Sequence, residues 1–163
     1  MVKQQKFSLN YKDDALLDLV RKTDHRILAI WAIDCVERVM PFFEINFPED
    51  GRPRQAILTL HQWVDTGVFK MAVIRKASLD SHAAAREAGE DNAARSAARA
   101  AGQAVATAHV PTHSLGAEKY ALQAVYRAAN PAEADAAVSQ ERDWHFQRLM
   151  QLREEQASES IKK

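Results

Sequence analysis

The chain has 163 residues, of which 47% are hydrophobic and 27% are charged, a composition typical of a globular protein in water. Lys plus Arg equals Asp plus Glu at 22 each, so the broad basic excess that binds nucleic acid electrostatically is absent. The single cysteine, Cys35, excludes an internal disulfide, and no run of residues approaches the roughly 20 apolar residues of a membrane span.

Helix is the dominant pattern along the chain and predicts an all-α fold. We expect a single domain over residues 1–163, built as a compact bundle of about six to seven helices. The polar N-terminus lacks a signal-peptide pattern, which favours a cytoplasmic location without contacts to membrane or nucleic acid. Zero net charge lowers self-repulsion, so we also expect a homo-oligomer.

The first elements follow a polar lead over residues 1–12. A short helix is predicted over 13–21 and a long one over 24–45, with Thr23 as the N-cap of the second. Apolar residues of the long helix recur at three and four, as a buried stripe requires, and Cys35 belongs to that stripe. Pro41 is expected to kink or fray its last turn.

Gly and Pro delimit the remaining elements. Gly67 and Gly89 end two helices, Asp91 is the expected cap of the next, and Pro111 disfavours helical geometry at the residue before it. The predicted helices lie over residues 53–66, 71–88, 92–108, 114–128 and 132–155, with a frayed tail over 156–163.

Alanine makes up about half of residues 83–108. Because alanine is the strongest helix former, this segment is predicted to be helical and not disordered. Small side chains let helix axes approach to about 8 Å. The alanine-rich pair of helices over 71–88 and 92–108 is therefore expected to lie at the centre of the bundle.

Two histidines, His109 and His113, flank Pro111 in the stretch ATAHVPTHSLGAEKYA. A metal site is one interpretation, but zinc needs three or four ligands and the proline breaks the helical face that His-x3-His requires. The favoured interpretation is a polar corner, in which His109 closes one helix, His113 begins the next, and each satisfies backbone groups. We expect neither a metal nor a cofactor.

Other polar residues fall at helical spacing. Asp34 and Arg38 share a face and can pair, either partly buried or in a solvated face. Arg52 and Arg54 at a helix start could hold an anion, or could pair with acids of the preceding helix such as Glu44.

Catalytic motifs are absent from the sequence. It contains no Gly-x-Ser-x-Gly, no phosphate-binding loop, no dinucleotide fingerprint and no His-Glu-x-x-His. None of the six histidines follows a glutamate by three residues, as diiron bundles require. We therefore assign no catalytic residue.

The stretches WAIDCVERV, GRPRQAI and ATAHVPTHSLGAEKYA occur in this order within residues 24–149. Together they resemble the Imm-5-like family, putative bacterial immunity proteins of polymorphic toxin systems. The resemblance implies an all-helical protein that binds and neutralises a cognate toxin, and it carries over no catalytic residue. The positions that match the family's recurrent polar residues are Asp34, Cys35, Glu37, Arg38, Arg52, Arg54, His82, Arg86 and His109.

Three functions remain open. The first is toxin binding through an exposed surface, for which Trp63 and Trp144 are the candidates. The second is a small-ligand-binding protein or enzyme, in which case Arg38 and His109 should line one cavity. The third is a polar network that only specifies packing. The residues of this network or pocket are Asp34, Glu37, Arg38, Arg52, Arg54, His82, Arg86, His109 and His113.

Overall fold

The computed structural model describes residues 7–9 and 12–163, which form eight α-helices and no strand. The all-α prediction is confirmed, with a slightly larger number of helices than the six to seven expected. The helices are α1 (Asp14–Arg21), α2 (His25–Glu37), α3 (Met40–Glu44), α4 (Arg52–Thr66), α5 (Met71–Glu87), α6 (Ala93–Ala106), α7 (His113–Ala128) and α8 (Ala134–Ile161).

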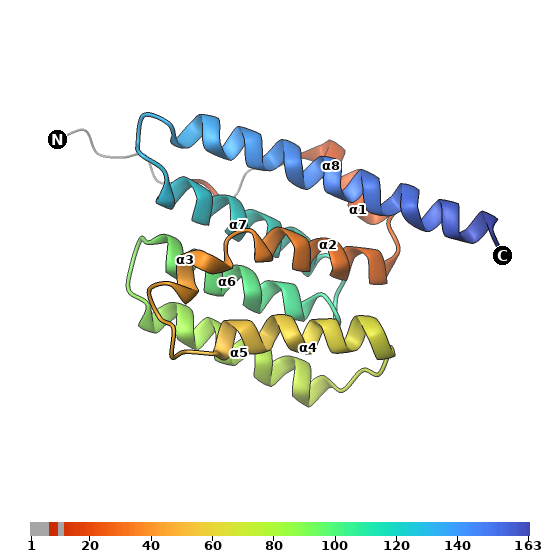
Figure 1. Cartoon of the computed structure of the whole chain (residues 1–163), viewed down its shortest axis with the longest axis horizontal. Helices are drawn as coiled ribbons and strands as arrows, with labels where there is room; N and C mark the ends of the chain where they lie inside the picture. The colour runs from red at the N-terminus through yellow and green to blue at the C-terminus, as the bar shows by residue number, and fades with distance from the viewer. Residues whose placement is uncertain (1–6, 10–11) are drawn as a thin grey trace.

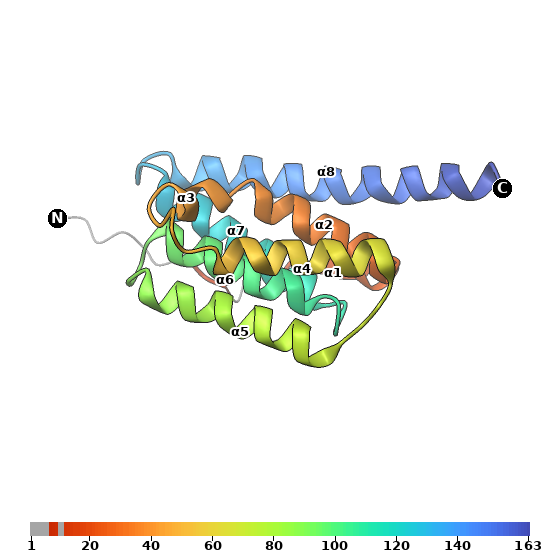
Figure 2. The same cartoon turned by 60° about the horizontal axis from the view of Figure 1, so that its bottom comes forward.

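The helices stack from α8 on one side of the bundle to α4 and α5 on the other, with α2, α6 and α7 between them (Figures 1 and 2). Helix α6 contacts α2, α3, α4, α5 and α7 and is the central element. The last turns of α8 extend past the other helices. Within the described residues, no helix is both long enough and apolar enough to cross a membrane.

Helix α6 is central because its residues are small. Eight of its nine buried residues are alanine, glycine or serine, and only short side chains let five neighbours approach one helix. The hydroxyl of Ser81 on α5 donates to the carbonyl of Ala98 at 2.8 Å, and Ser78 donates to the carbonyl of Gly102 at 2.9 Å. Helices must lie close for such short side chains to reach a neighbouring backbone.

Helix α5 is not central, although the sequence predicted that both alanine-rich helices would lie at the centre of the bundle. It packs mainly against α4 and α6 and lies at the edge of the bundle (Figure 2). Its outer face leaves Met71, Val73 and Leu79 exposed. The alanine-rich composition of its second half predicted burial, but the larger apolar residues of its first half are the exposed ones.

The expected long helix over 24–45 is divided into α2 and α3. Its N-cap is Asp24, whose carboxylate accepts from the backbone N–H of Arg26 at 3.0 Å. The Thr23 hydroxyl donates instead to the carbonyl of Leu19 at 2.6 Å. The break falls before Pro41, which stands in the first turn of α3, where a missing N–H costs nothing.

Other boundaries follow local chemistry closely. Gly67 ends α4 in the left-handed conformation, with φ of 66°, as predicted. Asn92 and not Asp91 caps α6, since its side chain accepts from the N–H of Arg95 at 2.8 Å. The tail expected to fray over 156–163 is helical as far as Ile161. Most of the lead over 1–12 lies outside the described residues.

Two groups of buried apolar side chains form the core. The larger one contains residues of all six helices from α2 through α7 and surrounds α6. The smaller one joins α1, α2 and α8 around Trp31. Cys35 belongs to the smaller group and is fully buried, which confirms its predicted place in the core.

Candidate functional site

The polar residues selected from the sequence lie in three separate parts of the bundle. One set joins α2 to α8, a second joins the start of α4 to its neighbours, and a third lines a cavity beside α5. Arg38 and His109 therefore do not share a cavity, contrary to the arrangement that the pocket interpretation required.

Asp34 and Arg38 do not pair with each other, so the pairing predicted from their spacing is wrong. Arg38 holds Glu141 of α8 through two hydrogen bonds of 2.5 and 2.9 Å, and its guanidinium lies 4.0 Å from the ring centre of Trp144. Asp34 accepts from Nε of Arg148 at 2.7 Å. Helix α8 supplies a partner for each residue, and these contacts fasten α8 onto α2.

The two arginines at the start of α4 are occupied by carboxylates. Arg54 donates to Glu37 at 2.5 Å and to Glu44 at 2.6 Å, as the pairing interpretation expected. Arg52 donates to Asp50 at 2.7 Å and to Glu87 at 2.5 Å. With both guanidinium groups bound to two acids, the alternative of an anion site at this helix start has no free cation to support it.

A buried charged cluster that the sequence did not reveal surrounds His145 of α8. Its Nδ1 lies 3.3 Å from a carboxylate oxygen of Glu118 on α7, and its Nε2 lies 3.3 Å from Glu141. The His145 carbonyl accepts from Trp31 Nε1 at 2.8 Å. The spacing of Glu141 and His145, four residues apart on one helix, is the only signal in the sequence that could have predicted it.

Protonation of this cluster follows from its carboxylates. Burial disfavours the charged imidazole, but Cys35, Glu118 and Glu141 outweigh burial and raise the pKa of His145 well above its usual value. Burial also raises the pKa of the Cys35 thiol. Although burial opposes it, His145 and Arg38 lower the pKa of Glu141 to about 2.

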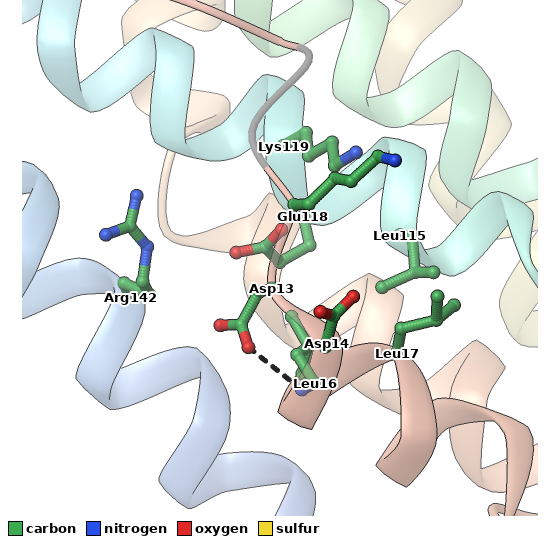
Figure 3. A pocket seen from close by; sticks show the side chains of 9 residues that line it. Asp13, Asp14, Leu16, Leu17, Leu115, Glu118, Lys119 and Arg142 are labelled. Atoms are coloured by element: carbon green, nitrogen blue, oxygen red, sulfur yellow. Dashed lines mark hydrogen bonds between the residues drawn. The ribbon is translucent and has the colours of Figure 1, made fainter.

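A small cavity of about 180 Å³ lies beside this cluster, between α1, α7 and α8. Figure 3 shows the carboxylates of Asp13 and Glu118 directed toward the side where Arg142 lies. Asp13 also caps α1 by accepting from the N–H of Leu16 at 3.0 Å. The lining contains three acidic and three basic residues, so it does not favour a ligand of either charge.

The largest concentration of histidines lines a cavity of about 400 Å³ between α5 and the corner that joins α6 to α7; we call it the histidine cavity. His82 comes from α5, His109 from the corner and His113 from the first turn of α7, and apolar side chains of α5 complete the wall. Arg86, which was expected in this group, is exposed on α5 and does not line the cavity.

Each histidine of the cavity has a side-chain partner. His113 donates from Nδ1 to Oε1 of Gln103 at 2.8 Å, and His82 accepts at Nδ1 from Arg99 at 3.1 Å. His109 stacks on Phe69, with 6.0 Å between ring centres. The expected polar corner exists, but its imidazoles contact side chains and not the backbone groups that we predicted as partners.

Two glycines allow this arrangement. A Cβ on Gly102 would lie 2.8 Å from Nε2 of His82, and a Cβ on Gly116 would lie 2.5 Å from Oε1 of Gln103. Burial and the positive charge of Arg99 lower the pKa of His82 to about 4. Burial also lowers the pKa of His113. At neutral pH both imidazoles are therefore uncharged, and their rings are held in place.

Exposed apolar side chains lie at the histidine cavity and at an adjacent hollow on the α4 side. Of the eight large apolar side chains that the described residues expose, five belong to this region, and we call them the apolar rim: Met71 and Leu79 line the cavity, Phe69 stacks on His109, and Val68 and Val73 line the adjacent hollow. The rim consists of Val68, Phe69, Met71, Val73 and Leu79, each between 43% and 60% exposed. A cluster of this kind on a protein surface is typical of a protein-binding site.

Trp63 and Trp144, the two tryptophans proposed as a partner surface, are both partly buried, and Trp63 lines the hollow beside the rim. Trp63 is half-buried against His25, with 4.7 Å between ring centres, and Trp144 is half-buried beneath Arg38. The sequence pointed to tryptophan because it is common in binding hot spots. Local periodicity could not show that the smaller apolar residues of α5 would be left without a neighbouring helix.

No group of three or more His, Cys, Asp or Glu side chains in residues 7–9 and 12–163 is arranged to hold a metal ion. The sequence model of the Imm-5 like putative immunity protein family matches residues 18–152. Comparison with curated proteins gives no match, and comparison with solved structures gives none either.

Proposed function

We propose that this chain, which belongs to the Imm-5 like putative immunity protein family, binds a cognate bacterial toxin and neutralises it without catalysis. The family match carries this proposal, because it spans α2 to α7 and most of α8. An inhibitor of this kind needs a surface complementary to its target and does not need a reaction centre.

The ion pairs made by the polar residues that match the family pattern support a role as a binding protein. Arg38, Arg52 and Arg54 are each engaged by carboxylates of neighbouring segments, so they hold the helices in register and do not converge on a substrate. Such pairs add little net stability because desolvation offsets much of their attraction, but they select one packing. A rigid helical framework then presents the apolar rim to a partner.

A second candidate function rests on the histidine cavity. Its volume of about 400 Å³ falls within the range of roughly 300–1,000 Å³ found for small-molecule sites. In this alternative the protein retains a small ligand near His82, His109 and His113. Native mass spectrometry of the purified chain tests it directly, because a bound ligand adds a defined mass that is lost on denaturation.

Growth rescue tests the main proposal. Each toxin-domain gene adjacent to the gene for this chain in its source genome is expressed alone and together with the chain. We expect one neighbour to arrest growth alone and to be tolerated when the chain is present, and the two purified proteins to coelute in size-exclusion chromatography. An unrelated helical protein at the same expression level is the control. If no growth-arresting neighbour is relieved by the folded chain, the proposal is wrong.

A further inference from the structure

We propose that the histidine cavity and the apolar rim together form the anchor site for a partner protein whose contact segment carries a large apolar side chain flanked by carboxylates. This inference rests on the proposed function in taking the partner to be the toxin. It adds to that function the surface used and the chemistry of the segment that binds it.

The apolar part of the inference comes from the positions of the rim residues. Met71 and Leu79 line the histidine cavity and also belong to the rim, so the opening of the cavity is itself apolar. Phe69 stacks on His109 at the same opening. An aromatic or large aliphatic side chain that enters would remove this exposed surface from water, which is the main favourable term in protein association.

The interior of the cavity suits an uncharged group. His82 and His113 are neutral at physiological pH, and their rings are held by Arg99 and Gln103. An entering apolar side chain therefore displaces water without desolvating a charged imidazole at either of these two residues. Because the walls are already positioned, little ordering cost is left for the binding step.

The formally charged residues that line the cavity and the hollow beside it are basic. Arg75 is the one charged residue among those described in the lining, and Lys70 is the one charged residue in the adjacent hollow of about 140 Å³ on the α4 side. No acidic residue occurs between positions 93 and 117, which include all of α6. Carboxylates beside the anchor residue would meet these cations, and such complementarity selects partners and speeds encounter.

The same charges disfavour a second copy of this chain as the occupant. In a two-fold symmetric dimer the same patch lies on both sides of the interface. Pairing the rim with itself would therefore bring together two patches that both carry Arg75 and Lys70. A foreign acidic segment meets no such repulsion.

Three variants of the full-length chain separate the parts of the inference. Leu79→Asp removes a rim side chain and adds a repelling charge, Ala106→Phe fills the cavity without changing charge, and Arg75→Glu reverses the lining charge. The matched controls are Ile45→Asp at an exposed apolar position at the end of α3, and Arg21→Glu at an exposed position on α1. Circular dichroism and thermal melting will check that each variant is folded.

The first experiment uses random linear peptides displayed on phage, selected on the wild-type chain. We expect enriched peptides to share a Phe, Trp or Leu beside Asp or Glu. Their affinity should fall at least about tenfold for Leu79→Asp and Ala106→Phe, and by a smaller, salt-dependent factor for Arg75→Glu, with both controls unchanged. Enrichment of basic peptides, of no shared pattern, or of peptides that bind Leu79→Asp as tightly as the wild type would overturn the inference.

The second experiment measures binding of the rescuing toxin to the same variants. If the toxin binds all of them equally, the anchor site is wrong while the proposed function stands. If no toxin is found but the peptides behave as expected, the proposed function fails while the anchor site stands. Two other outcomes would assign the site to another occupant and overturn the inference. One is a dimer that is detected by light scattering and becomes a monomer in Leu79→Asp. The other is a small molecule that copurifies with the wild-type chain and is absent from Ala106→Phe.

Discussion

At the scale of single residues, His145 of α8 links α8 to Trp31 of α2 and Glu118 of α7. It is fully buried and lies between the carboxylates of Glu118 and Glu141. A buried carboxylate without a cation is costly, whereas the complete cluster is close to neutral in energy. The cluster therefore specifies how the helices pack more than it adds to stability.

Replacing His145 by alanine tests this role. We expect His145→Ala to lower the free energy of unfolding by about 3–5 kcal/mol, because the buried carboxylate of Glu118 loses its contact with His145, Glu141 keeps only Arg38, and a cavity is left. Urea unfolding followed by circular dichroism measures the change. Arg148→Ala, which removes an ion pair with Asp34 whose side chains are 25% and 27% exposed, is the control and should cost about 1 kcal/mol or less. Equal losses in the two variants would contradict the special role of His145.

The same cluster predicts the pH dependence of stability. The pKa of His145 is raised on folding, so its contribution is complete below its unfolded value of 6.5 and is lost as pH rises through the folded pKa. The pKa of Glu141 is lowered from 4.5 to about 2, so its contribution is present above 4.5 and is lost as pH falls toward 2. Urea denaturation curves measured from about pH 2 to alkaline pH should show that the unfolding free energy falls at both ends of the range. The alkaline loss should disappear in His145→Gln, and its persistence there would assign it to another group.

At the scale of secondary-structure elements, the contact between α5 and α6 depends on a glycine. Gly102→Ala would place a Cβ 2.8 Å from His82 Nε2, so the ring must shift, which disturbs its bond to Arg99. We expect a net loss of about 1–2 kcal/mol in unfolding free energy, although alanine is by itself the better helix former.

Two further variants make that prediction specific. His82→Ala in the Gly102→Ala background removes the clash. His82→Ala should therefore lower the unfolding free energy much less in that background than in the wild-type chain. Gly51→Ala is the control, because a Cβ at Gly51 meets nothing within 4 Å and its φ of −81° suits any residue. Additive losses in the double variant would show that the contact with His82 is not the cause.

The division of the elements shows how far local signals reach. Gly67, Pro53 and the proline at 111 marked real boundaries, because they act on the backbone of their immediate neighbours. The break between α2 and α3 was missed, because Pro41 was expected to disturb the end of one helix when it in fact occupies the first turn of the next. The N-caps are Asp24 and Asn92, each one residue after the expected Thr23 and Asp91, which is within the usual uncertainty of helix ends.

At the scale of the whole molecule, the final turns of α8 extend past the other helices (Figure 1). From residue 157 onward every side chain is exposed, and the last buried side chain is Leu152. Ending the chain after Glu155 should therefore change the unfolding free energy by less than about 0.5 kcal/mol. Thermal melting of the shortened and full-length chains checks this. A clear drop in melting temperature would mean that the extension contacts a second molecule.

The sequence by itself determined the helical class, most helix boundaries, the burial of Cys35 and the central place of α6. These features depend on propensity, capping and side-chain size, which act over a few residues. Only the tertiary structure decided that Arg38 meets Glu141, that three histidines share one cavity, and that α5 keeps an exposed apolar face. Ion pairs and cavities depend on distances between helices far apart in the chain, and no local pattern encodes those distances.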